Sequence, residues 1–247
     1  MMTETSKPSE HLGRGRNALE FWESTVVKKP ASLLEPLTIK AFPQVFVPII
    51  SFDTTLGTFT MPRMLPSTVE RRRTALMAGL DKLRLLWQQP QADNYNRSWR
   101  PKLYAHLTKI ARENPQHVPK TIVEVVQSLP EPHRHVHIHG DATLANLIHN
   151  DLDEWFWIDP LQREFIPGDP HVDLGKLFQS CLGYESVLLG HDPPSVDREL
   201  CKQLARHANL NLNFGMKWLT VHIARLIPYQ EERVKKHYAD ILKLMNL

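Results

Sequence analysis

The pattern of apolar residues changes near Pro66, and this change constrains the fold more than any other feature of the sequence. Before Pro66, short runs of β-branched and aromatic residues are separated by turn-forming residues, which is typical of β-strands. After it, apolar residues recur every three or four positions over long stretches, which is typical of amphipathic α-helices. The pattern predicts an α+β protein of two lobes, a small β-rich N-terminal lobe and a larger α-helical C-terminal lobe.

The expected elements of the first lobe are a hairpin at 18–22 and 25–28, a helix at 32–42, and strands at 45–50 and 58–61. Residues 1–11 are too polar to bury an apolar surface, so we expect a disordered leader there. We therefore place the small lobe at 12–66 and the helical lobe at 67–247. The helices expected in the second lobe span 67–89, 99–114, 121–128, 172–189, 195–209 and 212–247.

Composition excludes several classes of protein. The chain has 247 residues, 42% of them apolar, and a formal net charge of only +3, so its overall field does not indicate a nucleic-acid-binding protein. No apolar run is long enough to cross a membrane, and the polar start does not resemble a signal peptide. The two cysteines, Cys181 and Cys201, lack the spacing of metal ligands. We therefore expect a cytoplasmic enzyme or binding module.

Residues 135–159 form the most informative segment. Val136 and Ile138 alternate with three histidines, which predicts a short strand that ends at Gly140 and presents Asp141. A hairpin follows, with strands at 147–148 and 155–158. Asn146 enters this hairpin and Asp159 leaves it, so both side chains should lie close to one point, with Asp141 nearby.

Two carboxylates and an amide oxygen suit phosphoryl transfer. Hard oxygen atoms are the ligands that Mg²⁺ prefers, and a carboxylate can orient an attacking hydroxyl and accept its proton. We therefore predict Asn146 and Asp159 as magnesium ligands and Asp141 as the catalytic residue.

The segment resembles the aminoglycoside phosphotransferase and choline kinase superfamily, whose catalytic loop reads His-Gly-Asp, four residues, Asn, with a metal-binding Asp after the next strand. His139, Gly140, Asp141, Asn146 and Asp159 fill these positions. The resemblance implies a bilobal protein-kinase-like fold, ATP and Mg²⁺ as cofactors, and an alcohol group as phosphate acceptor. It also implies that Asp173, in the Asp-Leu pair downstream, braces the catalytic loop.

The nucleotide-binding residues of the first lobe are less sharply defined. Gly13 and Gly15 form a lone Gly-x-Gly that could lie over the phosphates. Lys28 and Lys29 end a predicted strand, and because side chains alternate along a strand only one of them can face the nucleotide. Glu35 either pairs with that lysine or caps the helix from Ser32.

Residues 58–66 resemble the hinge between kinase lobes, where backbone groups meet adenine. Met61 and Met64 either line an apolar adenine slot or pack into the core. We expect the acceptor to be a small hydroxyl compound, and a sugar or an amino alcohol suits a slightly basic chain better than a polycationic aminoglycoside.

Three alternatives remain open. The run from His135 to His139 also resembles histidine-triad nucleotide hydrolases, although Gly140 and Asp141 depart from that motif. The same three histidines, with His149, could bind zinc. Finally, the short first lobe fits a non-catalytic kinase-like module that binds a nucleotide or a partner protein.

Overall fold

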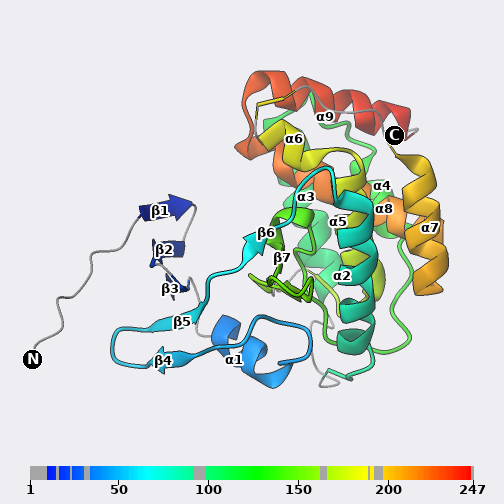
Figure 1. Ribbon diagram of the computed structural model, residues 1–247. Helices are drawn as coiled ribbons and strands as arrows, with labels where there is room; N and C mark the ends of the chain where they lie inside the picture. The colour runs from blue at the N-terminus through cyan, green and yellow to red at the C-terminus, as the bar shows by residue number, and fades with distance from the viewer. Residues whose placement is uncertain are drawn as a thin grey trace, which may run out of the picture.

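The computed structural model describes residues 10–14, 17–22, 24–30, 34–91, 98–161, 166–188, 190–191 and 197–245 of the chain. Its two lobes are an antiparallel sheet with one helix at the N-terminal end and a larger helical body (Figure 1). The α+β fold predicted from the sequence is confirmed.

The small sheet has five strands in the order β1-β2-β3-β5-β4, all antiparallel to their neighbours. Its elements are β1 (Glu10–Arg14), β2 (Asn17–Phe21), β3 (Thr25–Lys29), β4 (Ser51–Asp53), β5 (Thr58–Pro62) and the helix α1 (Leu34–Ala41). In β3, Val26 and Lys28 are buried while Lys29 is exposed, because alternate side chains of a strand face opposite sides of the sheet. Lys28 is therefore the lysine that points inward.

Two expectations for this lobe were wrong. Glu10 and His11, placed in the leader, belong to β1, because β1 pairs along its whole length with β2; residues 1–9 lie outside the described residues. The run 45–50 is not a strand of the small sheet, whose β4 begins at Ser51. Instead the amide of Val47 donates to the carbonyl of Trp157 (3.1 Å), and the amide of Trp157 donates to that of Val45 (3.0 Å).

A second sheet of three strands lies in the larger lobe. It consists of β6 (Leu65–Pro66), β7 (Leu147–His149) and β8 (Trp155–Trp157), in the order β6-β7-β8. β7 and β8 are the expected hairpin, and β6 continues directly from β5, so the chain leaves the small sheet and joins the second one within a few residues (Figure 1).

The helices of the larger lobe are α2 (Arg72–Trp87), α3 (Trp99–Glu113), α4 (Ile122–Gln127), α5 (Pro170–Cys181), α6 (Tyr184–Leu188), α7 (Arg198–Ala208), α8 (Leu212–Leu226) and α9 (Glu232–Leu244). Two of the expected helices are each divided in two. Gly183 separates α5 from α6 with a positive φ of 75°, and a short 3₁₀ turn that contains Pro228 separates α8 from α9.

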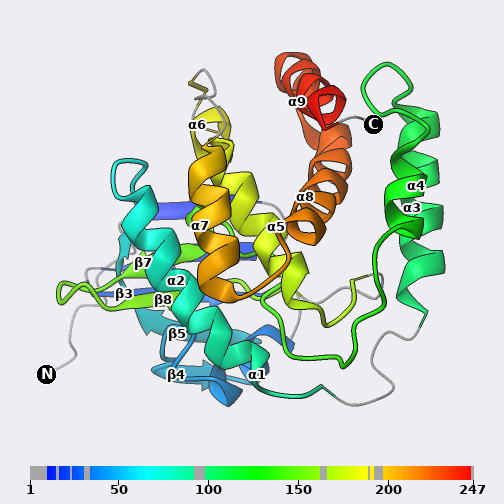
Figure 2. The same cartoon turned by 90° about the vertical axis from the view of Figure 1, so that its right-hand side faces the viewer.

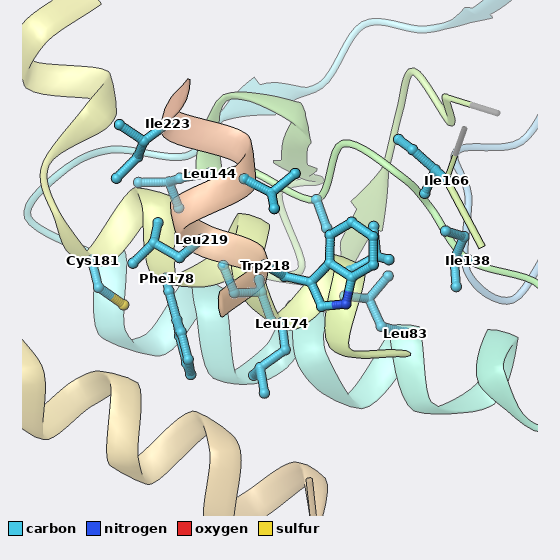
Figure 3. Close-up of a cluster of buried hydrophobic side chains, with 14 of the residues drawn as sticks. Leu83, Ile138, Leu144, Ile166, Leu174, Phe178, Cys181, Trp218, Leu219 and Ile223 are labelled. Atoms are coloured by element: carbon cyan, nitrogen blue, oxygen red, sulfur yellow. The ribbon is translucent and has the colours of Figure 1, made fainter. Parts of the chain in front are cut away.

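The core of this lobe forms where α5 and α8 cross, and Figure 2 shows the two helices side by side to the right of α7. A Cβ on Gly175 would lie 2.7 Å from Cβ of Trp218, and one on Gly215 would lie 2.7 Å from the Phe178 ring, so both glycines are needed for this close approach. Figure 3 shows Trp218 in the resulting cluster, together with Leu174, Leu83 and Leu219. Within the described residues, no helix is both long and apolar enough to cross a membrane.

Candidate active site

The candidate site lies where α1 and β3 of the small lobe meet the end of β8. The ammonium of the buried Lys28 lies 2.6 Å from Oε1 of Glu35 and also bonds to Oδ1 of Asp159. Burial lowers the pKa of Lys28 and raises that of Glu35, and the attraction between the two groups opposes both shifts. Glu35 therefore meets the lysine, and Lys29, the neighbouring candidate, faces solvent.

Asp159 follows β8 in a left-handed conformation, with φ of 57°. This conformation is uncommon for a residue with a side chain, although Asp tolerates it better than most. It turns the carboxylate toward Lys28 instead of along the strand. Backbone strain of this kind occurs often at functional sites.

Asp141 and Asn146 form a pair within one loop. Nδ2 of Asn146 donates to the carbonyl oxygen of Asp141 (2.8 Å) and to its Oδ2 (3.1 Å). These two bonds fix the amide, and among the described residues no donor reaches its Oδ1. The amide of Ile158 donates to the backbone carbonyl of Asn146 (3.0 Å), which holds this loop beside the residue that precedes Asp159.

His139 connects the loop to the end of β8. Its Nδ1 accepts a hydrogen bond from the amide of Asp141 (3.2 Å), and its Nε2 lies 2.8 Å from the carbonyl oxygen of Ile158. Nδ1 as acceptor and Nε2 as donor define a neutral imidazole. Burial lowers its pKa to about 4, opposed by the charge of Asp141 and by the bond to Ile158. His139 thus positions the site and is no candidate for an acid or base at neutral pH.

Asp173, in the first turn of α5, holds the loop in place by hydrogen bonds. Its Oδ2 accepts from the amide of His139 (2.9 Å) and from the indole of Trp87 (2.9 Å), and its Oδ1 accepts from the amide of Gly140 (2.7 Å). The φ of Gly140 is +79°, and a Cβ there would lie 1.9 Å from the carbonyl oxygen of Leu161, so the loop requires glycine at this position.

Lys176 is the site residue that the sequence analysis missed. Its ammonium lies 2.9 Å from Oδ1 of Asp141, and its side chain is only 9% exposed. Burial raises the pKa of Asp141, but the ammonium of Lys176 and the amide of Asn146 hold it below its usual value. The spacing from Asp173 was the available signal, since residues three apart share one face of a helix.

The remaining predicted residues that the structure describes take no part in the contacts given above. Gly13 pairs with Ala18 in the β1-β2 ladder, and Gly15 lies outside the described residues. Met61 is buried in β5 opposite Val26, and Met64 packs against the core. The two methionines thus occupy core positions, and a contact with adenine stays a prediction.

The histidine alternatives are not supported by the geometry. Residues 135–139 form no strand ladder beyond one bridge between Val136 and Pro90. The three histidines of this run contact different partners. His135 accepts from the amide of Gly168, His137 packs on Phe42, and His139 is bonded as described above. In the described part of the chain, no group of three or more His, Cys, Asp or Glu side chains is placed to hold a metal ion.

Magnesium needs fewer protein ligands. One or two protein oxygens commonly bind it, together with substrate phosphates and water. Two groups fit this requirement. One is the carboxylate of Asp159, which bonds to the ammonium of Lys28, and the other is the side-chain oxygen Oδ1 of Asn146. A cavity of about 520 Å³ also opens between α4, α7, α8 and α9, but none of the site residues named above lines it.

The fold and this arrangement define a class, the bilobal kinase-like proteins, in which a loop and a following hairpin of a helical lobe face a small β-rich lobe. Comparison of the sequence with protein-family models gives no match, and comparison with curated protein sequences gives none either. Solved structures, in contrast, resemble the chain over nearly its whole length.

A choline/ethanolamine kinase family protein from Mesorhizobium loti is 14% identical, with a TM-score of 0.58, over 98% of this chain and 89% of that one. A putative fructosamine-3-kinase from Haemophilus somnus is 13% identical, with a TM-score of 0.58, over 94% and 90%. An aminoglycoside phosphotransferase from Streptomyces rimosus is 16% identical, with a TM-score of 0.54, over 86% and 91%. The fold is thus the one that these structures share, the bilobal protein-kinase-like fold that the catalytic-loop resemblance implied.

Proposed function

We propose that this protein is a phosphotransferase that moves the γ-phosphate of ATP to a hydroxyl group of a small molecule. The observation that carries the proposal is the continuous set of contacts from Glu35 through Lys28 to Asp159, and from Ile158 through Asn146 to Asp141. These contacts join a buried cation, two candidate magnesium ligands and a carboxylate base at the boundary between the lobes.

Each group has a separate role in the proposed reaction. Lys28, held by Glu35, neutralises phosphate charge, and Asn146 and Asp159 would hold Mg²⁺. Mg²⁺, when bound, supplies electrostatic stabilisation of the transferred phosphoryl group. Asp141 orients the acceptor hydroxyl and receives its proton while the hydroxyl oxygen bonds to the γ-phosphorus. The bond from phosphorus to the bridging oxygen breaks, and ADP leaves.

The acceptor class draws on the neighbouring folds. Structures of this fold include a glucosamine kinase in complex with glucosamine and ADP, and an aminoglycoside phosphotransferase in complex with ADP and streptomycin. By analogy, we infer a small organic molecule with a hydroxyl group as acceptor, and ATP as donor. The lobes assigned to 12–66 and 67–247 would bind the nucleotide and the acceptor, respectively.

We also infer a cytoplasmic location. Cys181 and Cys201 are both buried and free, and burial raises the pKa of the Cys181 thiol well above its usual value. Free cysteines persist most readily in a reducing compartment.

The test is ADP formation with ATP, Mg²⁺ and a panel of sugars, polyols, amino alcohols and aminoglycosides. We expect at least one acceptor to raise ADP formation well above the rate without acceptor. Asp141→Ala should abolish this increase while ATP still binds, since the base does not hold the nucleotide. A wild-type protein that binds ATP but transfers phosphate to none of the acceptors would instead support the non-catalytic module.

A further inference from the structure

A cavity in the helical lobe lies apart from the proposed active site. It opens between α4, α7, α8 and α9, has a volume of about 520 Å³, and is lined by none of the site residues named above. α8 contacts the other three helices, and Figure 2 shows it between α7 and α4. The cavity residues of α7 are Arg198, Cys201 and Lys202, and those of α9 are Ile241 and Met245. Residues three or four apart share one face of a helix, so both helices turn a single face toward the cavity.

The described wall of the cavity is aliphatic. Most of the side chains that line it belong to valine, leucine, isoleucine and methionine, and none of the described lining residues is aromatic. The hydroxyl of Thr220 donates to the carbonyl oxygen of Met216 (3.0 Å), so its proton is already used. A planar ring would therefore find no ring to stack on, and a polyol few partners for its hydroxyls, whereas an alkyl chain would bury its apolar surface.

Positive charge gathers in the lining of this cavity. Its charged residues are Arg198, Lys202 and Lys217, and no carboxylate is among the described lining residues. Lys202 lies 3.7 Å from Glu199, but both side chains are exposed, and such pairs are weak. The ammonium of Lys217 donates to a neutral group, the carbonyl oxygen of Ser128 (3.1 Å). Arg198 and Lys217 have no carboxylate partner among the residues that the structure describes.

Carboxylates next to lining residues along the chain are engaged elsewhere or exposed. Asp197 caps α7, where its Oδ1 accepts from the amide of Leu200 (2.9 Å), and Oδ1 of Asp240 lies 3.1 Å from the ammonium of Lys243. Glu124 is exposed, and none of the three carboxylates lines the cavity. The described lining therefore keeps a net positive charge over an aliphatic wall, and an amphiphilic anion complements both.

We propose that this cavity binds a free fatty acid. The alkyl chain lies against the aliphatic wall, and the carboxylate pairs with the cations of α7 and α8. Each additional pair of buried CH₂ groups should tighten binding about 10-fold, because removal of apolar surface from water drives the association. This site is separate from the proposed active site, so binding there does not depend on phosphoryl transfer.

Calorimetric titration of octanoate, decanoate and dodecanoate into the full chain tests the dependence on chain length. At neutral pH, and below the concentrations at which micelles form, each should bind at one site per chain, with the dissociation constant falling about 10-fold at each step. Dodecanoate should reach about 10 µM. Decylammonium has the same number of carbons as decanoate and the opposite charge, so it should bind at least about 10-fold more weakly.

Variants of the lining locate the binding site. Met216→Trp places a larger side chain in the cavity and should weaken dodecanoate binding at least about 10-fold. The double variant Arg198→Met/Lys217→Met should weaken decanoate binding at least about 10-fold and remove the preference over decylammonium. Arg206→Met is the matched control, because Arg206 is an exposed arginine of α7 that does not line the cavity, and it should bind decanoate as wild type does. If Met216→Trp is poorly folded by circular dichroism, Leu212→Trp, at the start of α8, takes its place.

Failure of dodecanoate to bind wild type at concentrations up to about 1 mM would overturn the inference. Equal affinity for decanoate and decylammonium, or unchanged dodecanoate affinity in the folded tryptophan variant, would overturn it too. ATP with Mg²⁺ should leave dodecanoate bound, because no residue of the proposed active site lines the cavity. Displacement of dodecanoate by ATP would place the fatty acid at the active site and contradict the assignment to this cavity.

Discussion

Lys28 shows how much of the proposed chemistry depends on a single inward-facing side chain. The residue is 1% exposed, and its ammonium contacts one carboxylate from α1 and one from the end of β8. A cation buried between two carboxylates is well placed to meet a phosphate that enters the same space. Lys29, next to it, carries the same charge but is exposed to solvent.

We predict that Lys28→Met lowers kcat/KM for ATP by about 100-fold or more, because removing one preorganised electrostatic contact typically costs this much. The matched control, Lys29→Met, should change it by less than about 3-fold. Steady-state kinetics at fixed acceptor concentration measures both.

A loss of stability must be separated from this loss of activity. Lys28→Met leaves Glu35 buried without its cation, and breaking a buried ion pair in this way costs about 3–5 kcal/mol. The double variant Lys28→Met/Glu35→Gln should recover most of the unfolding free energy but not the activity. Recovery of activity in the double variant would argue against a role for Lys28 in phosphate binding.

His139 predicts a pH dependence of stability. Its pKa is about 4 in the folded protein and about 6.5 when unfolded, so the unfolded chain binds a proton that the folded protein does not between these values. The contribution of neutral His139 to the free energy of unfolding is complete above pH 6.5. It falls by about 3 kcal/mol as the pH decreases toward 4. Burial also lowers the pKa of His222, which adds to the loss. Burial raises the pKa of Asp173 from 3.8 to about 6, which opposes the loss between these two pH values.

Urea unfolding at several pH values between 4 and 7 measures this loss. In His139→Gln the slope of the unfolding free energy against pH should be smaller by the equivalent of about one bound proton. An identical slope in wild type and variant would mean that another group controls the acid sensitivity.

At the scale of elements, α5 organises the loop that carries Asp141 and Asn146. Its N-cap, Asp169, accepts from the amide of His171 (2.9 Å), and Asp173 in its first turn accepts three N–H bonds from the loop and from α2. A carboxylate near a helix N-terminus is also favoured by the helix dipole. The same helix, one turn further on, delivers Lys176 to Asp141.

We predict that Asp173→Asn destabilises the protein by about 2–4 kcal/mol, because an amide cannot accept all three N–H bonds and leaves a buried donor without a partner. Trp87→Phe removes only one of these bonds and should cost about 1–2 kcal/mol. Urea denaturation compares the two. A change below 0.5 kcal/mol in Asp173→Asn would show that the loop holds its shape without the brace.

Sequence patterns predicted elements well where local signals decide the structure. The β7-β8 hairpin and the helices α2, α3 and α7 occur within a few residues of their expected positions. The run 45–50 misled because its apolar residues pair with Trp157, more than 100 residues away, and no local pattern records such a contact. Residues 135–139 alternate like a strand but lie extended between separate partners.

The site residues, too, could be predicted where local spacing identifies them, and not where contacts between distant elements decide. The loop residues Asp141, Asn146 and Asp159 could be selected from spacing, but the choice between Lys28 and Lys29 required the register of β3 against β5. The spacing from Asp173 indicates that Lys176 shares the loop-facing side of α5, but its contact with Asp141 depends on how α5 packs against the loop, which spacing does not record.

At the scale of the whole molecule, the two lobes are joined by short connections that end at the site. β5 leads into β6, and the segment 45–47 pairs with β8 two residues before Asp159. The small lobe provides Lys28 and Glu35, and the helical lobe provides Asp141, Asn146 and Asp159. A nucleotide at this boundary would contact both lobes.

The most direct test of this account is calorimetric titration of ATP into wild-type protein and Asp159→Asn, each with and without Mg²⁺. Wild type should bind ATP at least about 10-fold more tightly with Mg²⁺ than without it, because metal ligation contributes to affinity. Asp159→Asn should lose this difference while remaining folded. Absence of ATP binding to wild type, or the same magnesium dependence in Asp159→Asn, would contradict the account.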